Sequence, residues 1–309
     1  MTHKPHNVDV LTLDELESKE INNIIDLAID LKKEQKKGKT KPLLENKTLA
    51  MIFEKPSTRT RVSFETGMFQ LGGHALTLSP NDLQLSRGES IGDTARTLSR
   101  YVNVIMARVY DHKSLETFAR NSSIPVINGL SDSFHPCQIL ADLMTIKEHK
   151  KNLKKIKIAW IGDGNNVCNS LILGCAKLKI KLSVAIPDGY EPDFDVVKIG
   201  KDAEILEVSD NPELAVNDAD VVMTDTFVSI HNTNSDRVKK FLPTFQVTQS
   251  LMNKAKKDAI FMHCLPAKRD QEVTSDVIDG PQSVVWDEAE NRLHVQKALL
   301  VHLLGVLGL

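Results

Sequence analysis

Short apolar runs and segments with helical periodicity alternate along the first half of the chain. The apolar run Thr48–Phe53 precedes a helical pattern at 59–71, and the run 102–107 precedes another at 113–120. Parallel strands need long crossover connections, which are usually helices. The alternation therefore predicts an α/β fold built on a parallel sheet.

The same alternation continues in the second half, where an apolar run at 156–161 precedes a helical pattern at 167–178. Further strand-like runs follow at 181–186, 203–208, 221–224 and 259–262. With 309 residues, the chain is longer than most single hydrophobic cores. We therefore expect two doubly wound α/β domains in tandem, each with a parallel sheet.

A lysine-rich connector marks the predicted boundary between the domains. The helical pattern that starts after Pro136 runs into this connector at 150–155. We place the first domain at 1–150 and the second at 151–287. The last segment, 288–309, has the broad apolar face of a helix, and we expect it to pack back toward the first domain.

The composition is that of a soluble globular protein, with 41% hydrophobic and 26% charged residues. The net charge of -2 argues against a nucleic-acid partner. We expect the two lysine-rich runs, 32–41 and 147–157, to be solvated helix ends or linkers. No apolar stretch approaches the ~20 residues of a membrane helix, and the N-terminus lacks a secretory or transit pattern. A cytoplasmic protein with no membrane partner is expected.

The cysteines, at 137, 168, 175 and 264, form neither a Cys-x-x-Cys pair nor a zinc-like ladder. We therefore expect no disulfide framework, no metal and no cofactor. Cys264 differs from the others because polar residues flank it at the end of an apolar run.

A candidate anion site follows the first strand-like run. Ser57, Thr58, Arg59 and Thr60 come after Pro56 and open a helical pattern. Backbone N–H groups, hydroxyls and a guanidinium at one helix N-terminus can stabilise a phosphate. An ordinary helix capped by Ser57, with exposed arginines, is the alternative, and this segment alone does not decide between them.

Two more residues could complete this pocket. Arg108 follows the strand-like run 102–107, and His135 ends a strand-like stretch just before Pro136 and Gln138. In parallel sheets, ligands bind beyond the carboxyl ends of strands, where both residues are expected.

Five segments now resemble, in their usual order, the signatures of the aspartate and ornithine carbamoyltransferase family. They are Ser57-Thr-Arg-Thr60, Ser86-Arg-Gly-Glu-Ser90, His135-Pro-Cys-Gln138, Gly162-Asp-Gly-Asn-Asn166 and His263-Cys-Leu-Pro266. The ornithine-using branch is the closest match, through the Cys-Leu-Pro motif and the stretch from Asp225 to Ser229. An aspartate acceptor would need cationic groups, whereas Asp225 suits an amine.

The resemblance implies carbamoyl phosphate and L-ornithine as substrates and assigns a role to each motif. The phosphate would contact Ser57, Thr58, Arg59, Thr60 and Arg108, with Gln84 added from a neighbouring subunit. The carbamoyl end would meet His135, Pro136, Cys137, Gln138 and Arg292. Ornithine would contact Asn166, Asp225, Ser229, Ile230, Cys264 and Leu265. Arg59, Arg108, His135 and Cys264 would act in catalysis.

The chemistry needs a polarised carbonyl, a stabilised leaving phosphate and a neutral amine. The acceptor amine resembles that of lysine, with a pKa of about 10.4, so it must lose a proton before it attacks. Cys264 is the expected aid in this step, although a buried structural thiol is the commoner fate of a free cysteine.

The resemblance also implies two domains that close over the ligands and assemble as a homotrimer. The chain departs from the family at Ser229-Ile230-His231, where the family has Ser-Met-Gly. Histidine does not adopt the positive φ of glycine without cost, which leaves loop closure and the acceptor open.

Other functions remain to be tested. A nicotinamide oxidoreductase would use Gly162 and Gly164 after a strand, but Val167 stands where a third glycine is needed. A ligand sensor of the same fold, without turnover, is a second alternative. Within the family, putrescine or an acylated ornithine could replace ornithine.

Overall fold

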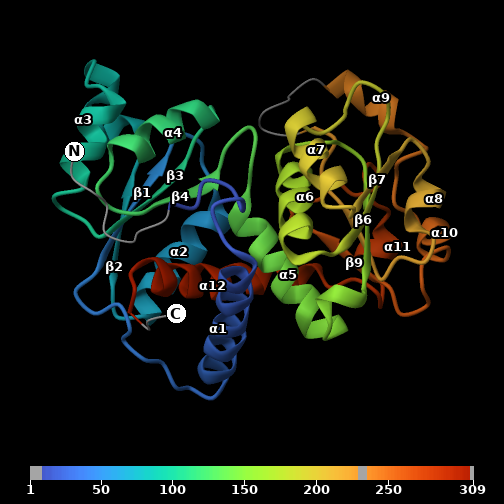
Figure 1. The fold of residues 1–309 in the computed structure, drawn as a ribbon, viewed down its shortest axis with the longest axis horizontal. Coiled ribbons are helices and arrows are strands. Elements are labelled where there is room, and N and C mark those ends of the chain that lie inside the picture. The colour runs from blue at the N-terminus through green and yellow to red at the C-terminus, as the bar shows by residue number, and fades with distance from the viewer. Residues whose placement is uncertain (1–8, 229–234, 307–309) are drawn as a thin grey trace. The chain divides into compact units, whose positions relative to one another are not determined.

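The computed structural model describes residues 9–228 and 235–306 of the chain. These residues form two compact units (Figure 1). The first comprises the described residues up to Met144 together with those from Asn291 onward, and the second spans Thr145–Glu290. Two α/β units with parallel sheets are thus confirmed.

The first unit contains a four-stranded parallel sheet in the order β2-β1-β3-β4. In chain order its elements are α1 Ser18–Lys36, β1 Thr48–Phe53, α2 Thr58–Gln70, β2 His74–Leu78, α3 Ile91–Leu98, β3 Val104–Arg108, α4 His112–Asn121 and β4 Val126–Leu130. Helix α5 Pro136–Lys150 starts in this unit, and most of α12 Val285–Leu303 returns to it.

The second unit contains a five-stranded parallel sheet in the order β7-β6-β5-β8-β9. Its elements are β5 Lys157–Ile161, α6 Asn166–Leu178, β6 Lys181–Ala185, α7 Phe194–Asp202, β7 Leu206–Ser209, α8 Pro212–Val216, β8 Val221–Thr224, α9 Val238–Phe241, α10 Gln249–Met252, β9 Ile260–His263 and α11 Ser275–Ile278.

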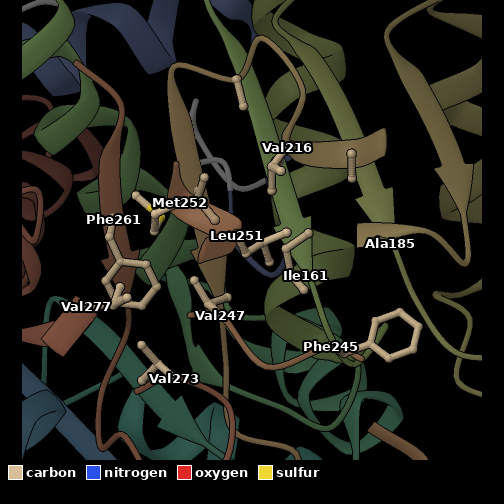
Figure 2. Close-up of a cluster of buried hydrophobic side chains, with 14 of the residues drawn as sticks. Ile161, Ala185, Val216, Phe245, Val247, Leu251, Met252, Phe261, Val273 and Val277 are labelled. Carbon is tan, nitrogen blue, oxygen red and sulfur yellow. The ribbon is translucent and has the colours of Figure 1, made fainter. Parts of the chain in front are cut away.

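Helices cover both faces of each sheet (Figure 1). In the first unit, α3 and α4 pack together over one face, where Ile105, Leu115 and Phe118 belong to a buried cluster. In the second unit, α6 and α7 lie on one face and α8 on the other. Figure 2 shows the core on that second face, which includes Val247 and Phe261. Burial of these side chains from water is the main stabilising contribution to each unit.

The C-terminal helix packs within the first unit, as the apolar face predicted. Buried Leu299 and Val301 lie on α12. Polar contacts join the same helix to α1, because the Lys32 ammonium donates to Asn291 Oδ1 at 2.7 Å and Lys297 donates to Gln35 Oε1 at 2.9 Å. Burial lowers the pKa of Lys297 to about 8.

Two expectations about local structure are wrong. Lys32 is buried and paired rather than solvated, because α1 extends through it and lies against α12. His135 does not end a strand, since β4 stops at Leu130 and a five-residue loop, 131–135, leads to α5. The polar residues Ser131-Asp-Ser interrupt the apolar run, so the strand ends at Leu130, before them.

No helix in the described ranges combines the length and the apolar character needed to span a membrane.

Candidate functional site

Each sheet reverses its direction of winding between two adjacent strands. The chain winds from β1 outward to β2 and then starts again on the other side of β1 with β3. In the second unit the reversal lies between β5 and β8. Ligands of open α/β sheets bind beyond the carboxyl ends of the strands at such a point. The segments after β1, β3, β5 and β8 are therefore the first places to look for a site.

In the first unit, helix α2 begins just beyond β1. Ser57 is its N-cap, and the hydroxyl of Ser57 accepts a hydrogen bond from the N–H of Thr60 at 3.3 Å. The N–H groups of Thr58 and Arg59 lie in the first turn and have no intrahelical acceptor. The side chains of Thr58 and Arg59 are exposed. Ser57 therefore caps the helix, and N–H groups of the first turn are still available to bind an anion. A capped helix and an anion site are compatible at this position.

Three arginines surround His135. Burial lowers the pKa of His135 well below its ordinary value, and the positive charges of Arg292, Arg108 and Arg59 lower it further. The imidazole of His135 is therefore neutral near pH 7. Arg108 is the last residue of β3 and pairs in register with Phe53 of β1. The fold thus brings these predicted residues together at the reversal point of the first sheet.

Arg292 reaches this group from the C-terminal helix. Its guanidinium donates to Gln138 Oε1 at 2.6 Å and to Thr60 Oγ1 at 3.2 Å, and all three side chains are buried. The Nε2 of Gln138 donates to Asp142 Oδ1 at 2.8 Å. A carboxylate oxygen is an acceptor, so Asp142 turns the amide nitrogen of Gln138 toward itself and the amide oxygen toward Arg292.

Other predicted residues of the first unit lie apart from this group or point away from it. Gln84 is exposed on a 3₁₀ turn, Gln84–Arg87, where its Oε1 accepts from Arg87 at 3.4 Å. Cys137 is fully buried, its thiol donates to Asn128 O at 3.4 Å, and burial raises its pKa to about 11. Pro136 is the first residue of α5.

In the second unit, Asp225 joins the loops that follow three neighbouring strands. It comes directly after β8, and its Oδ2 accepts from Asn165 Nδ2 at 2.7 Å in the loop after β5. Its Oδ1 accepts from the Thr226 N–H at 2.7 Å and from the Cys264 thiol at 3.2 Å, beyond β9. Asn166, the first residue of α6, is 8% exposed. Asn166, Asp225 and Cys264 thus follow the ends of three neighbouring strands at one end of this sheet.

A buried histidine supports the loop that carries Cys264 and Leu265. The Nδ1 of His263 accepts from the Leu265 N–H at 2.9 Å, so its Nε2 carries the proton and faces Glu272 Oε1 at 3.2 Å. The His263 N–H donates to Glu288 Oε2 at 2.9 Å. Leu265 has a φ of +57°, a conformation that costs a leucine about 1 kcal/mol or more and must be held by its surroundings.

Asp225, His263 and Cys264 offer ligand atoms within 4.8 Å of one another, as a metal site would. Both ring nitrogens of His263 are engaged, however, one with the Leu265 N–H and the other with Glu272. Metal ligation needs a free imidazole lone pair. The group is therefore a hydrogen-bonded cluster in this structure and does not fit a metal ion.

A buried ion pair anchors the turn that precedes α6. Arg237 donates to Asp163 Oδ1 at 2.9 Å, and both side chains are less than 10% exposed. The guanidinium also lies 4.8 Å from the ring centroid of Tyr190, within the range of a cation–π contact. Burial raises the pKa of Asp163 to about 6, although the charge of Arg237 opposes that rise.

The predicted acceptor loop, with Ser229, Ile230 and His231, lies outside the described residues.

Several residues of the site are absent from the sequence-based prediction. Asn165 could have been found from the sequence, because an asparagine before a helical pattern is a strong N-cap candidate. In the structure it caps α6, and its Oδ1 accepts from the N–H groups of Val167 and Cys168. Asp142, Glu272 and Arg237 had no such signal. Each lies within or near an ordinary helix or turn pattern, and only the folded chain shows its partner.

Two family models together match almost the whole chain. The description "Aspartate/ornithine carbamoyltransferase, carbamoyl-P binding domain" matches residues 8–148, and "Aspartate/ornithine carbamoyltransferase, Asp/Orn binding domain" matches residues 154–303. The chain is 60% identical over 300 residues to an ornithine carbamoyltransferase of Cenarchaeum symbiosum, covering 97% of this chain and 99% of that one. It is 55% identical to one of Pyrococcus abyssi, covering 96% of each.

Solved structures are similar over the same extent. The ornithine carbamoyltransferase from Pyrococcus furiosus superposes with a TM-score of 0.91 at 54% identity, and the similarity covers 97% of each chain. The enzyme from Thermus thermophilus has a TM-score of 0.88 at 39% identity, covering 98% of this chain and 100% of that one.

The Asp163–Arg237 pair generates a prediction for stability. Arg237→Met removes the cation and leaves Asp163 buried, which should destabilise the protein by about 3–5 kcal/mol near pH 8. The loss should shrink as the pH falls toward 6 and be smallest below it, because Asp163 titrates near 6 beside Arg237 and at a higher pH without it, and a neutral carboxyl needs no cation. Thermal or urea unfolding of wild type and variant at pH 8 and pH 5 measures the difference.

Arg269→Met is the matched control, since Arg269 pairs with Asp279 in the same unit but both side chains are exposed. This substitution should change the stability little at both pH values, because solvent screens an exposed pair. An equal loss for both variants, or a loss for Arg237→Met that does not change with pH, would contradict the assigned role of the pair.

Proposed function

The chain belongs to the aspartate/ornithine carbamoyltransferase family, and we propose that it transfers the carbamoyl group of carbamoyl phosphate to the side-chain amine of L-ornithine. The products are L-citrulline and phosphate. The observation that carries this proposal in the structure is the meeting of two buried arginines at one end of the first sheet: Arg108 ends β3 beside the end of β1, and Arg292 donates to Thr60 in the first turn of α2. Such a group suits a ligand that combines a phosphate with a carbonyl.

The first unit is the carbamoyl phosphate-binding part, with 1–150 and the closing helix 288–309 as its proposed extent. The phosphate binds at the N-terminus of α2, where the N–H groups, the hydroxyls of Ser57 and Thr58, and Arg59 converge. Arg108 supplies a buried positive charge at the end of β3. Fixed positive groups stabilise the phosphate as it leaves with the electrons of the broken C–O bond.

The carbamoyl oxygen takes the developing negative charge. Arg292 is positioned for it by Gln138 and Thr60, and the neutral imidazole of His135 can donate a hydrogen bond without a charge of its own. Preorganised donors of this kind are worth about 3–4 kcal/mol each in related acyl-transfer sites. Gln84 belongs to the proposed phosphate contacts only if a neighbouring subunit presents it, because in this chain it is exposed.

The second unit, proposed to extend over 151–287, binds ornithine. Asp225 attracts the α-amino group, and the Asn166 amide meets the carboxylate. Ser229 and Ile230 are proposed to line the same acceptor site. Cys264 and Leu265 follow β9 and lie at the position proposed for the side-chain amine, where the Cys264 thiol already donates to Asp225.

Transfer requires the amine in its neutral form. An amine with a pKa of about 10.4 is mostly protonated at pH 7, so the rate should rise with pH until another group titrates. The Cys264–Asp225 contact gives the proton a path away from the amine, through groups that can donate and accept. The neutral nitrogen forms the C–N bond, the C–O bond to phosphate breaks, and the nitrogen gives up a second proton, which the departing phosphate can accept.

The nicotinamide alternative meets a physical obstacle in the turn after β5. Asn165 already satisfies the N–H groups of Val167 and Cys168, which a pyrophosphate would need. A Cβ at Gly164 would lie 2.3 Å from Pro192 N, so the glycine serves close packing of the chain against itself. The site is built for amide and carboxylate contacts instead.

We extend the proposal to a homotrimer that works in the cytoplasm in arginine synthesis. A relative from Pyrococcus furiosus that is 54% identical carries the name "Ornithine carbamoyltransferase, anabolic". Exposed apolar side chains on α2 and the edge strand β2 support self-association, since Phe69 is 81% exposed and Val62 is 54% exposed. Sedimentation equilibrium should give about three times the 34.4 kDa chain mass, and a monomer mass would reject the trimer.

The acceptor is tested directly by offering L-ornithine, putrescine, L-aspartate and N-acetylornithine in parallel and quantifying each carbamoylated product. Turnover should occur with ornithine, because of the four only ornithine offers an α-amine to Asp225, a carboxylate to Asn166 and a side-chain amine to the carbamoyl group. Preferred turnover with putrescine or N-acetylornithine would reassign the acceptor. Binding of carbamoyl phosphate without any product would favour the sensor.

Cys264→Ser tests the proton path. The serine hydroxyl ionises far less readily than a thiol, so kcat should fall on the order of 100-fold while the KM for carbamoyl phosphate stays unchanged. Cys175→Ala, which removes a buried thiol from α6, is the control and should keep its turnover. Unchanged kcat and ornithine KM in Cys264→Ser would reject the assigned role.

A further inference from the structure

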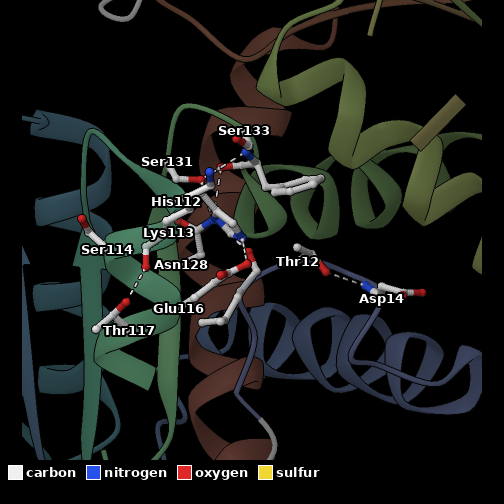
Figure 3. Close-up of polar contacts among 12 residues, drawn as sticks. Thr12, Asp14, His112, Lys113, Ser114, Glu116, Thr117, Asn128, Ser131 and Ser133 are labelled. Carbon is white, nitrogen blue, oxygen red and sulfur yellow. Dashed lines mark hydrogen bonds and ion pairs between the residues drawn. The ribbon is translucent and has the colours of Figure 1, made fainter. Parts of the chain in front are cut away.

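The loop 131–135, which connects β4 to α5 and ends in His135, is held by one side chain from another helix. His112, the first residue of α4, contacts this loop in three ways, and Figure 3 shows its side chain beside Ser131. Its Nδ1 lies 2.9 Å from Ser131 Oγ, and its backbone N–H donates to Asp132 Oδ1 at 3.0 Å. Its ring meets the Phe134 ring edge-on at 5.0 Å between centroids. These contacts cover the loop up to the residue before His135.

The hydrogen bonds around Ser131 determine which nitrogen of His112 carries the proton. Ser131 is fully buried, and its hydroxyl oxygen accepts from Phe134 N and from Asn128 Nδ2, each at 3.2 Å. Phe134 N donates to this oxygen, and the two Asn128 Nδ2 hydrogens are shared among Leu11 O, Ser131 Oγ and Phe134 O, so the Ser131 hydroxyl hydrogen can itself be donated to an acceptor. The nearest is His112 Nδ1 at 2.9 Å, because Phe134 O lies farther away at 3.4 Å. We infer from the shorter distance that His112 is the acceptor, which places its proton on Nε2, facing Glu116 at 4.0 Å.

Protonation of His112 would break this arrangement. A proton on Nδ1 would face the Ser131 oxygen, which already accepts from Phe134 N, and would displace the hydroxyl hydrogen from the contact. Burial lowers the pKa of His112 despite the opposing charges of Glu116, Asp132, Glu15 and Asp111. A lowered pKa keeps the ring neutral above its ordinary value of about 6.5, and the contact is lost as the pH falls below that value.

We propose that His112 is a positioning residue for carbamoyl transfer: by accepting the Ser131 hydroxyl hydrogen and packing on Phe134, it fixes the loop that presents His135 to the carbamoyl group. This inference rests on the proposed function. His112 touches no reacting atom and acts through the loop. His135 is 5% exposed, and the charges of three arginines act on its imidazole, so a small shift of the loop alters its distance to each of them. Displacements of about 1 Å at a catalytic group can cost 100-fold in rate.

Three variants of the full chain separate positioning from simple stability. His112→Ala removes the acceptor and the ring, whereas His112→Asn keeps an acceptor oxygen near the place of Nδ1 but does not titrate. Lys113→Ala, on the same helix with an exposed side chain, controls for disturbance of α4. All three retain the backbone N–H that donates to Asp132. Citrulline formation is measured at saturating L-ornithine from pH 5 to pH 8, together with the melting temperature of each variant.

His112→Ala should lower kcat by roughly 10- to 100-fold at pH 7.5, and His112→Asn should restore most of the loss. The ratio of His112→Asn to wild-type activity should rise as the pH falls below 6.5, because only wild type loses the Ser131 contact there. Lys113→Ala should match wild type. A folded His112→Ala variant with wild-type kcat, or a His112→Asn ratio that does not change with pH, would overturn the positioning role.

The same experiment keeps the two proposals apart. Absence of citrulline with wild type itself would reject the proposed function and, with it, this inference. Wild-type turnover together with unchanged turnover in His112→Ala would reject the inference alone.

Discussion

The reversal of winding in each sheet is the constraint on which the candidate site depends. When a parallel sheet grows in one direction from a central strand and then in the other, the connecting loops diverge and leave space beyond the carboxyl ends of the two central strands. In the first sheet, this brings the end of β3, with Arg108, beside the end of β1, which leads to the N-terminus of α2. In the second, it brings the loop after β5 beside Asp225, after β8. The positions of the functional groups follow from the topology of the sheets.

The helices that start at these two points are capped in different ways, and the difference matches the proposed ligands. Ser57 of α2 satisfies only the Thr60 N–H, so the positive end of that helix remains available to a phosphate. Asn165 of α6 accepts from two N–H groups and also donates to Asp225. The first arrangement favours an anion, and the second presents a carboxylate and an amide to an amino acid.

Buried hydrogen-bonded residues orient the side chains of the candidate site. Asp142 orients Gln138, which orients Arg292, and Glu272 fixes the tautomer of His263 beneath Leu265. His112 acts in the same way on the loop of His135. In a low-dielectric interior such chains strengthen each hydrogen bond, and they also make a missing partner costly. Rigid placement of donors before the substrates arrive is what gives a polar site its catalytic effect.

The sequence alone determined the α/β class, most strand positions and the return of the last helix to the first unit, because periodicity and turn residues are local properties of the chain. It also located the motifs around Ser57, His135, Asp225 and Cys264, although it did not identify α1, β2 and α3 and extended the strand-like stretch of β4 to His135. Strand β2 is short and lies at the sheet edge, so it lacks a continuous apolar run.

Only the tertiary structure decided which polar residues act together. Arg292 and Thr60 are 232 positions apart in the chain, and His112 and Ser131 are 19 apart, so no local pattern links either pair. The tautomers of His112 and His263, and the low pKa of His135, likewise depend on burial and on neighbours that the fold assembles. Local sequence specifies which elements form and which side chains they carry, whereas charge, protonation and orientation at the site are properties of the packed molecule.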